Sequence, residues 1–155
     1  MAVGAATWFD RAVRRGFDVG PFDLNGTDLY MILTTAAQAL TRSFTGGSGD
    51  CRYADFTAEL ATAFGYTNGG LAFTAPAINV VGTDQFFDSD PLTWALSATI
   101  SARYAVCIDK LSANDNALFF FDLNTSLGAG VNASIGPPTL ILTPDPDGWL
   151  KWYQP

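Results

Sequence analysis

The stretch Thr99–Asp109, with the sequence TISARYAVCID, decides the fold class of this chain. Its side chains fall into two alternating sets, as in a strand, where successive residues point to opposite faces of a sheet. The more apolar set is Ile100, Ala102, Tyr104, Val106 and Ile108, and the other set is Ser101, Arg103, Ala105, Cys107 and Asp109. This period of two predicts a single strand over Thr99–Asp109 with one buried face.

Two neighbouring stretches predict the other central strands. Thr27–Thr35, with the sequence TDLYMILTT, is apolar on both faces at its centre, and so is Ala117–Leu123. Strands of this kind are covered on both sides. The polar loop Lys110–Asn116 separates Thr99–Asp109 from Ala117–Leu123, which predicts a hairpin.

The remaining segments are shorter or interrupted. Leu71–Val81 predicts a weak strand that is broken at Pro76, because proline cannot donate to a strand ladder. Tyr53–Phe64 fits either a short helix or a loop that forms the wall of a binding surface. Thr125–Pro138 is rich in glycine and predicts a loop, and Thr139–Thr143 predicts a strand.

One helix is expected, at Thr7–Phe17, with Thr7 as a candidate N-cap. Its apolar stripe consists of Trp8, Phe9, Ala12, Val13 and Phe17, and Arg11, Arg14 and Arg15 lie near the opposite side. The basic side allows two interpretations. It is either the solvated face of a helix that packs on the body, or a docking element for an acidic partner.

Residues 149–155 form an aromatic arm or final strand at the end of the sequence. Chain ends fray unless they are tied down. The aromatic side chains of Trp149, Trp152 and Tyr153 therefore pack on their own domain or on a neighbouring subunit, where Trp and Tyr dominate binding energy. The partner interface predicted from the sequence consists of Trp8, Arg11, Arg14, Arg15, Trp149, Trp152 and Tyr153.

Composition supports a turn-rich β protein. The chain has 155 residues, which suits a single domain over residues 1–155. Only 15% of the residues are charged, against about 25% in an average domain. All the acidic residues except Glu59 are aspartates, which favour turns, and there are 15 Gly and 8 Pro. The sequence predicts a mainly β, single-domain antiparallel β-sandwich or barrel-like fold with a short N-terminal helix.

The net charge of −7 and the absence of histidine exclude several function classes. An acidic chain lacks the basic face that phosphate contacts need, so no nucleic-acid partner is expected. Without histidine there is no Ser-His-Asp triad, and the commonest zinc ligand is missing. No apolar run is long enough for a membrane helix, so no membrane partner is expected. Cys51 and Cys107 are expected to be small buried thiols.

Two pairs of aspartates are the remaining candidates for chemistry. Asp145–Gly148 is similar to part of a calcium loop but lacks the further ligands. Asp88 and Asp90 have the residue types of a glycan hydrolase, yet they also form an ordinary turn before Pro91. No catalytic residue, metal or cofactor is therefore expected.

Four segments together resemble a family of small bacteriophage virion structural proteins, which are described as head decoration, tail or fibre-like proteins. The segments are Asp28–Leu33, Gly65–Leu71, Trp94–Val106 and Leu118–Asp122. The resemblance spans Thr7 to Leu123, and Trp94–Val106 is its most specific part. From Thr125 onward this chain departs from the family, with a proline-rich turn and a tryptophan-rich end.

The resemblance implies a non-enzymatic virion component and no catalytic residues. The first hypothesis is a capsid decoration, or cement, protein that binds the major capsid protein on the outer surface of the head and stabilises the shell. It would assemble in the host cytoplasm as a homo-oligomer, most simply a trimer, because closed cyclic symmetry matches the threefold axes of a shell. The alternative is a tail, baseplate or fibre-adaptor component that binds tail proteins, and the weakest hypothesis is a glycan hydrolase.

Overall fold

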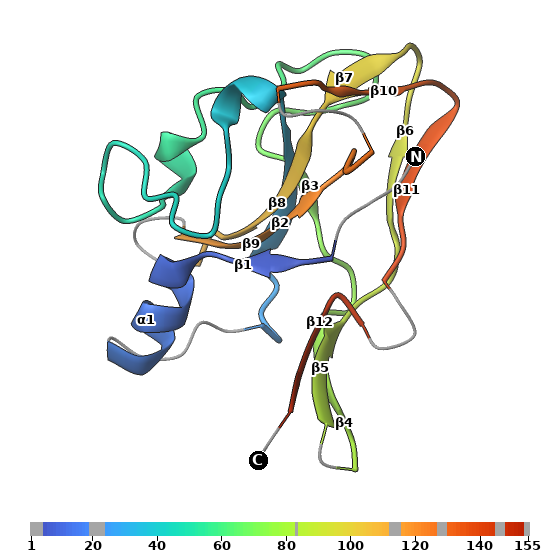
Figure 1. Cartoon of the computed structure of the whole chain (residues 1–155). Coiled ribbons are helices and arrows are strands. Elements are labelled where there is room, and N and C mark those ends of the chain that lie inside the picture. The colour runs from blue at the N-terminus through green and yellow to red at the C-terminus, as the bar shows by residue number, and fades with distance from the viewer. Residues whose placement is uncertain are drawn as a thin grey trace.

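A five-stranded antiparallel sheet lies at the centre of the computed structural model (Figure 1). Its strands, in spatial order, are β1 (Thr7–Trp8), β9 (Asn116–Asp122), β8 (Tyr104–Asp109), β2 (Leu29–Thr34) and β3 (Leu71–Ala72). β2, β8 and β9 are apolar and buried on both faces, which confirms the prediction for the stretches around β2 and β9. The structure describes residues 5–18, 24–82, 84–111, 116–126, 130–144 and 148–153, and for 15–18 and 151–153 it describes the backbone alone.

A long bent ribbon of two strands lies beside this sheet. Its first half pairs β6 (Leu92–Ala95) with β11 (Thr139–Leu142), and its second half pairs β7 (Ile100–Ala102) with β10 (Ala133–Ile135). At the bend, the amide of Leu96 donates to the carbonyl of Pro138 at 2.8 Å. Figure 1 shows the ribbon running up the right-hand side as β6 and β11 and turning across the top as β7 and β10. Burial alternates along each strand, so one face of the ribbon lies on the core and the other is exposed.

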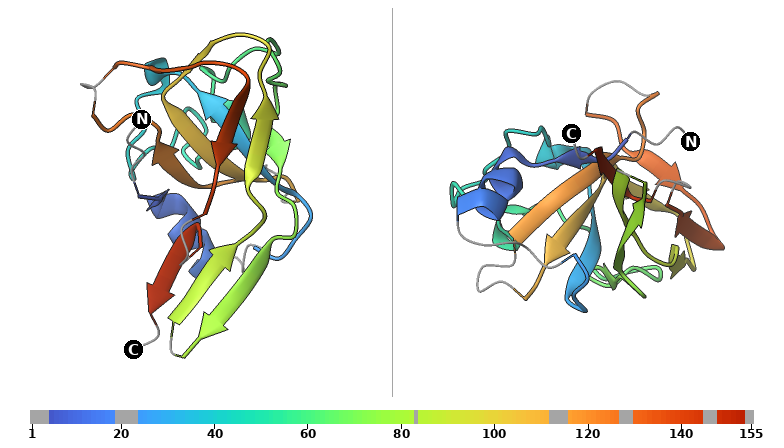
Figure 2. Two further views of the ribbon diagram at one scale, coloured as in Figure 1. Left: turned by 90° about the vertical axis from the view of Figure 1, so that its right-hand side faces the viewer. Right: turned by 90° about the horizontal axis from the view of Figure 1, so that it is seen from below.

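A three-stranded sheet extends away from the lower side of the body (Figures 1 and 2). Its strands, in spatial order, are β12 (Leu150–Tyr153), β5 (Asp84–Asp88) and β4 (Ala77–Val81). Rings of Phe73, Phe87 and Trp149 contact one another at its root, with centroids 5.5 to 5.7 Å apart. At the far end Val80 and Val81 are exposed. The expected aromatic arm is thus a paired strand that begins after a tryptophan of the core.

The stretch Thr99–Asp109 is not one strand, which corrects the first prediction. The chain breaks at Arg103, so that β7 and β8 belong to different sheets. The Arg103 side chain is 6% exposed, and its guanidinium donates to the carbonyl of Val131 at 2.7 Å and to the carboxylate of Asp122 at 2.6 Å. The break therefore places a buried cation where Asp122 of β9 and the carbonyl of Val131 accept hydrogen bonds from it.

Two further predictions change with this break. β7 finds a partner in Ala133–Ile135, so the glycine-rich segment Thr125–Pro138 is not entirely a loop. β8 continues in the central sheet and is buried on both faces rather than on one. The interruption expected at Pro76 is confirmed, because β3 ends before it and β4 begins after it. The described sheets form no closed barrel, so the barrel-like alternative is wrong and the mainly β prediction with a short helix is confirmed.

The N-terminal helix begins later than expected. The helix α1 spans Asp10–Asp18, whereas Thr7 and Trp8 form β1 and pair with Phe120 and Phe119. The amide of Phe9 also donates to β9, at the carbonyl of Leu118. Since these backbone groups are used in strand pairing, Thr7 is not an N-cap. Of the expected apolar stripe, Phe9 before the helix and Ala12 within it are buried, whereas Val13 is exposed.

The stretch Tyr53–Phe64 is mostly a loop. A single 3-10 turn, η2 (Tyr53–Asp55), is the only helical part of it. An earlier turn of the same kind, η1, spans Ala36–Gln38. After η2 the chain forms a bridge between Glu59 and Thr34 and then the hairpin described below, so the loop alternative is the correct one.

Candidate partner interface

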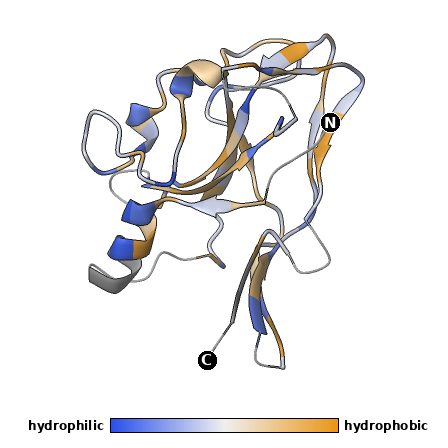
Figure 3. Ribbon diagram, in the orientation of Figure 1, coloured by the Kyte–Doolittle hydropathy of each residue, from blue (hydrophilic) through white to orange (hydrophobic). Residues whose placement is uncertain are grey.

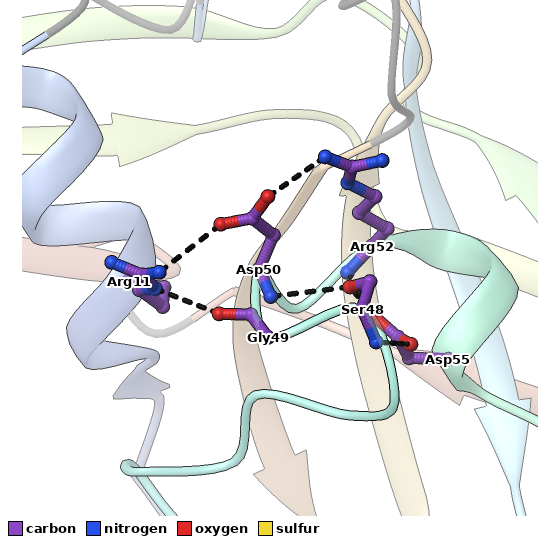
Figure 4. A network of polar contacts seen from close by, with 6 residues as sticks. All are labelled: Arg11, Ser48, Gly49, Asp50, Arg52 and Asp55. Atoms are coloured by element: carbon purple, nitrogen blue, oxygen red, sulfur yellow. Dashed lines mark hydrogen bonds and ion pairs between the residues drawn. The ribbon is translucent and has the colours of Figure 1, made fainter.

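The three arginines predicted for the interface do not form a continuous exposed row on α1. The guanidinium of Arg11 donates to the carbonyl of Gly49 at 2.9 Å and to the carboxylate of Asp50 at 3.2 Å (Figure 4). Arg14 is exposed, and the side chain of Arg15 lies outside the described atoms. Arg11 therefore fastens the helix to its own chain, and of the three arginines only Arg14 is seen facing solvent.

The aromatic residues predicted for the interface also divide. Trp149 is buried, and its indole Nε1 donates to the hydroxyl of Ser89 at 2.8 Å. It packs on its own domain, one of the two alternatives for this residue. Trp8 is half-buried and stands edge-on to Phe119, with ring centroids 5.8 Å apart. For Trp152 and Tyr153 the structure describes backbone pairing with β5 and not the side chains.

A polar network holds α1 against the loop of residues 46–55 (Figure 4). Asp50 bridges two arginines, because its carboxylate pairs with Arg11 and also with Arg52 at 2.7 Å. Asp55 accepts hydrogen bonds from the amide of Ser48 at 2.9 Å and from the amide of Arg52 at 2.8 Å. We name this set of residues, 11, 48–50, 52 and 55, the clasp.

The clasp lowers the pKa of the Asp55 carboxylate. Burial acts to raise the pKa, but hydrogen bonds from the Ser48 hydroxyl and from the amides of Arg52, Ser48 and Gly47 outweigh it, and the pKa is lowered from 3.8. Hydrogen bonds to the charged form favour that form. The clasp is thus built around an ionised aspartate, and its charges are already used within the chain.

Three long segments of the sequence contain no charged residue. Residues 60–83, 91–102 and 123–144 contain no Asp, Glu, Lys or Arg. The ribbon is built from the second and third of these segments, because β6 and β7 pair with β11 and β10. In Figure 3, β6 and β11 are white to orange, whereas strongly hydrophilic blue gathers on α1. Two of these segments build the ribbon, and the hairpin Ala63–Tyr66 of the first segment lies against it.

The hairpin Ala63–Tyr66 joins the first segment to the ribbon. Ala63 and Tyr66 exchange two backbone hydrogen bonds of 3.0 and 2.9 Å, and the amide of Ser97 donates to the carbonyl of Phe64 at 3.0 Å. Gly65 lies so close to the ribbon that a Cβ atom on it would overlap the carbonyl oxygen of Ala95. Only glycine fits at this position.

A buried tyrosine supports the hairpin from below. The hydroxyl of Tyr66 donates to the carboxylate of Glu59 at 2.7 Å and accepts from the amide of Leu33 at 3.0 Å. Glu59 also accepts from the hydroxyl of Tyr53 at 2.6 Å and from the amide of Gly69 at 2.7 Å. Burial and the neighbouring Glu59 carboxylate raise the pKa of Tyr66, so the phenol stays protonated as a donor.

We define the uncharged face as the exposed residues of the ribbon together with the hairpin tip. These residues are Phe64, Thr93, Ala95, Ser101, Ser134, Thr139 and Ile141. Phe64 and Ile141 are 54% and 55% exposed and are the large apolar side chains of this face. Interface cores are depleted of charged residues and enriched in aromatic ones. The uncharged face shares the absence of charged residues and contains one aromatic side chain, Phe64, whereas the clasp is charged.

The segments without charged residues are visible in the sequence, but they do not by themselves predict the uncharged face. The gaps between charged residues are visible along the chain, but their meeting in space depends on the pairing of β7 with β10 and on the contact of Gly65 with Ala95. Residue types alone pointed to the arginines and tryptophans at the two ends. The structure uses Arg11 and Trp149 for internal contacts.

The residues weighed for chemistry have structural partners. The carboxylate of Asp88 accepts from the amide of Ser89, and the amide of Asp90 donates to the carbonyl of Thr74, so both belong to the turn between β5 and β6. Asp145 and Asp147 lie outside the described residues. In the part of the chain that is described, no three His, Cys, Asp or Glu side chains gather as a metal site. Cys51 and Cys107 are buried thiols, as expected.

Within the described residues, no helix has both the length and the apolar character needed to cross a membrane. Comparison of the chain with protein-family models, with curated proteins and with solved structures gives no match.

Proposed function

We propose that this protein is a non-enzymatic structural component of a bacteriophage virion, a capsid decoration protein that binds the major capsid protein through the uncharged face. The observation that carries the proposal is that face itself. In a chain of net charge −7, the described residues of this face carry no charge, and two of them are large exposed apolar side chains. A contact made there leaves no charge unpaired, and burying an unpaired charge is strongly unfavourable.

The class of partner follows from the same chemistry. Nucleic acids and acidic peptides are recognised by cations, and the uncharged face has none. An uncharged protein surface is the complementary partner. The resemblance to small virion proteins implies a partner within the virion, and we propose the outer surface of a capsid shell, where a decoration protein binds in many copies.

Multivalent binding lowers the affinity that each single contact needs. One modest face binds weakly, but a homotrimer at a threefold axis presents three of them, and linked contacts raise the overall affinity by roughly two to four orders of magnitude. The acidic remainder of the surface would point outward and keep decorated shells apart. Trimer formation is part of this proposal.

The test is co-sedimentation of the purified protein with empty shells of the phage that encodes it, using a matched pair of variants. Ile141→Glu places a charge on the uncharged face, and Val80→Glu places the same charge on an equally exposed strand residue at the end of the projecting sheet. We expect Ile141→Glu to weaken binding at least tenfold and Val80→Glu to bind as the wild type does.

Copy number separates the two virion positions. A decoration protein is present in hundreds of copies per particle, and a tail component in small ring-like numbers, so quantitative mass spectrometry of intact virions distinguishes them. Wild-type protein that never binds shells and occurs only on isolated tails would replace the decoration proposal with the tail proposal.

A further inference from the structure

Phe64 has a backbone conformation that phenylalanine rarely adopts. Its φ is +55°, and φ of the next residue, Gly65, is +93°. Two consecutive positive φ values at the centre of a two-residue hairpin are those of a type I′ turn, for which Asn-Gly is the preferred pair. For a bulky side chain a positive φ is an outlier that signals strain. The other non-glycine residues with positive φ in the described chain, Ala39, Cys51 and Ala75, are all small.

The surrounding structure fixes Phe64 in this state. The hairpin is closed by hydrogen bonds between Ala63 and Tyr66, and the carbonyl of Phe64 itself accepts from Ser97. Gly65 is pressed against the ribbon at Ala95, and Tyr66 is anchored in the core by Glu59 and Leu33. Each neighbour of Phe64 is held, so the backbone fixes the direction of its Cα–Cβ bond.

The fold gains little from the Phe64 side chain. The residue is 54% exposed, so it buries little apolar surface, while its backbone carries the unfavourable conformation. A strained, over-determined residue that contributes little to the core indicates a role outside the fold. Aromatic side chains held rigidly on a surface are the usual anchors of protein interfaces, because little conformational entropy is lost when they bind.

We infer that Phe64 is the anchor of the uncharged face and inserts into an apolar socket on the partner. This inference rests on the proposed function and adds the residue that supplies most of the binding energy. The neighbours of Phe64 define the socket: Ser97 donates to its carbonyl, Gly65 lies against Ala95, and none of these residues is charged. The rim of the socket is therefore uncharged, and the occupant is a folded protein surface rather than a charged peptide or a nucleic acid.

The decisive variant is Phe64→Asn, because it changes stability and binding in opposite directions. Asparagine tolerates positive φ and creates the preferred turn sequence, so the unfolding temperature should rise. Loss of the aromatic ring should weaken binding to empty shells tenfold or more, as at a hot spot. Val80→Thr, which alters another exposed apolar side chain on the projecting sheet, serves as the control and should leave both measurements unchanged.

The outcomes separate this inference from the proposed function. If the wild type binds shells, Ile141→Glu does not, and Phe64→Asn binds like the wild type, the face is correct and the anchor is wrong. A Phe64→Asn variant that melts at a lower temperature shows a fold-supporting side chain and also overturns the inference. If the isolated wild type self-associates and Phe64→Asn dissociates it, the socket is on a second copy, which again contradicts the inference as stated. Failure of the wild type to bind shells refutes the proposed function.

Discussion

The loop of residues 46–55 and the hairpin Ala63–Tyr66 are both turn segments held beside the core, but different forces hold them. The loop is fastened by side-chain charges, with Asp50 between two arginines and Asp55 collecting amide donors. The hairpin is fastened by backbone hydrogen bonds, by the fit of Gly65 against Ala95 and by the buried hydroxyl of Tyr66 beneath it. A region that satisfies its charges internally has none to offer a partner, whereas a region fastened by its backbone leaves its side chains available.

The largest expected effect tests the fit of the hairpin. Gly65→Ala adds a Cβ at positive φ and against a backbone oxygen, and we expect a loss of about 3 kcal/mol of unfolding free energy from strain and overpacking together. Gly49→Ala is the matched control in the clasp, since Gly49 also has positive φ but open space around a Cβ. It should lose about 1 kcal/mol from strain alone. Urea unfolding monitored by tryptophan fluorescence measures both, and equal losses would refute the close fit.

A smaller effect tests the clasp through Asp55. Asp55→Ala removes the acceptor for the amides of Ser48 and Arg52, and we expect a loss of about 1–2 kcal/mol, the range for a capping residue. The variant should still bind shells as the wild type does, because the clasp is not part of the uncharged face. Loss of shell binding in a folded Asp55→Ala protein would show that the two regions are not independent.

Asp55 also gives the clasp a pH dependence. Its pKa is lower in the folded protein than the unfolded value of 3.8. Its contribution to stability is therefore complete above pH 3.8 and is lost as the pH falls through the folded pKa. The difference in stability between wild type and Asp55→Asn should shrink as the pH is lowered below 4, measured by urea unfolding at a series of pH values. A difference that stays constant across this range would contradict the assignment.

The smallest effect concerns the pair of Arg11 and Asp50. Both side chains are partly exposed, 40% and 30%, so solvent screens the pair. A double-mutant cycle with Arg11→Ala and Asp50→Ala should give a coupling energy of about 0.5 kcal/mol that decreases with added salt. Tyr66→Phe, which removes a hydroxyl beneath the hairpin, is the contrasting variant, and its effect on stability should be nearly independent of salt.

Local patterns predicted the parts of the fold that depend on local chemistry. Thr27–Thr35 and Ala117–Leu123 are apolar on both faces, and both stretches contain central strands. Proline cannot donate to a strand ladder, and the described chain is interrupted at Pro76, between β3 and β4. These predictions succeed because each depends on a residue and its immediate neighbours.

The errors all came from long-range partners. Alternation continues through Arg103, and no local feature marks a break, because the break depends on Val131 and Asp122 arriving from other segments. Thr7 has the residue type of an N-cap, yet β9 pairs with it instead. The uncharged face also depends on long-range partners, because Phe64 and Ile141 lie close to the same strand only after the ribbon has formed.

The labelling rates of the two buried thiols report how often different parts of the protein open. Cys51 lies within the loop that the clasp holds, and Cys107 lies in β8. Burial, and then the charge of Asp109, raise the pKa of Cys107, so alkylating reagents should react with it only when the central sheet separates. Cys51 would become accessible once the loop alone detaches. The ratio of the two labelling rates therefore measures, in a single unmodified protein, how much more often the charge-fastened loop opens than the molecule as a whole unfolds.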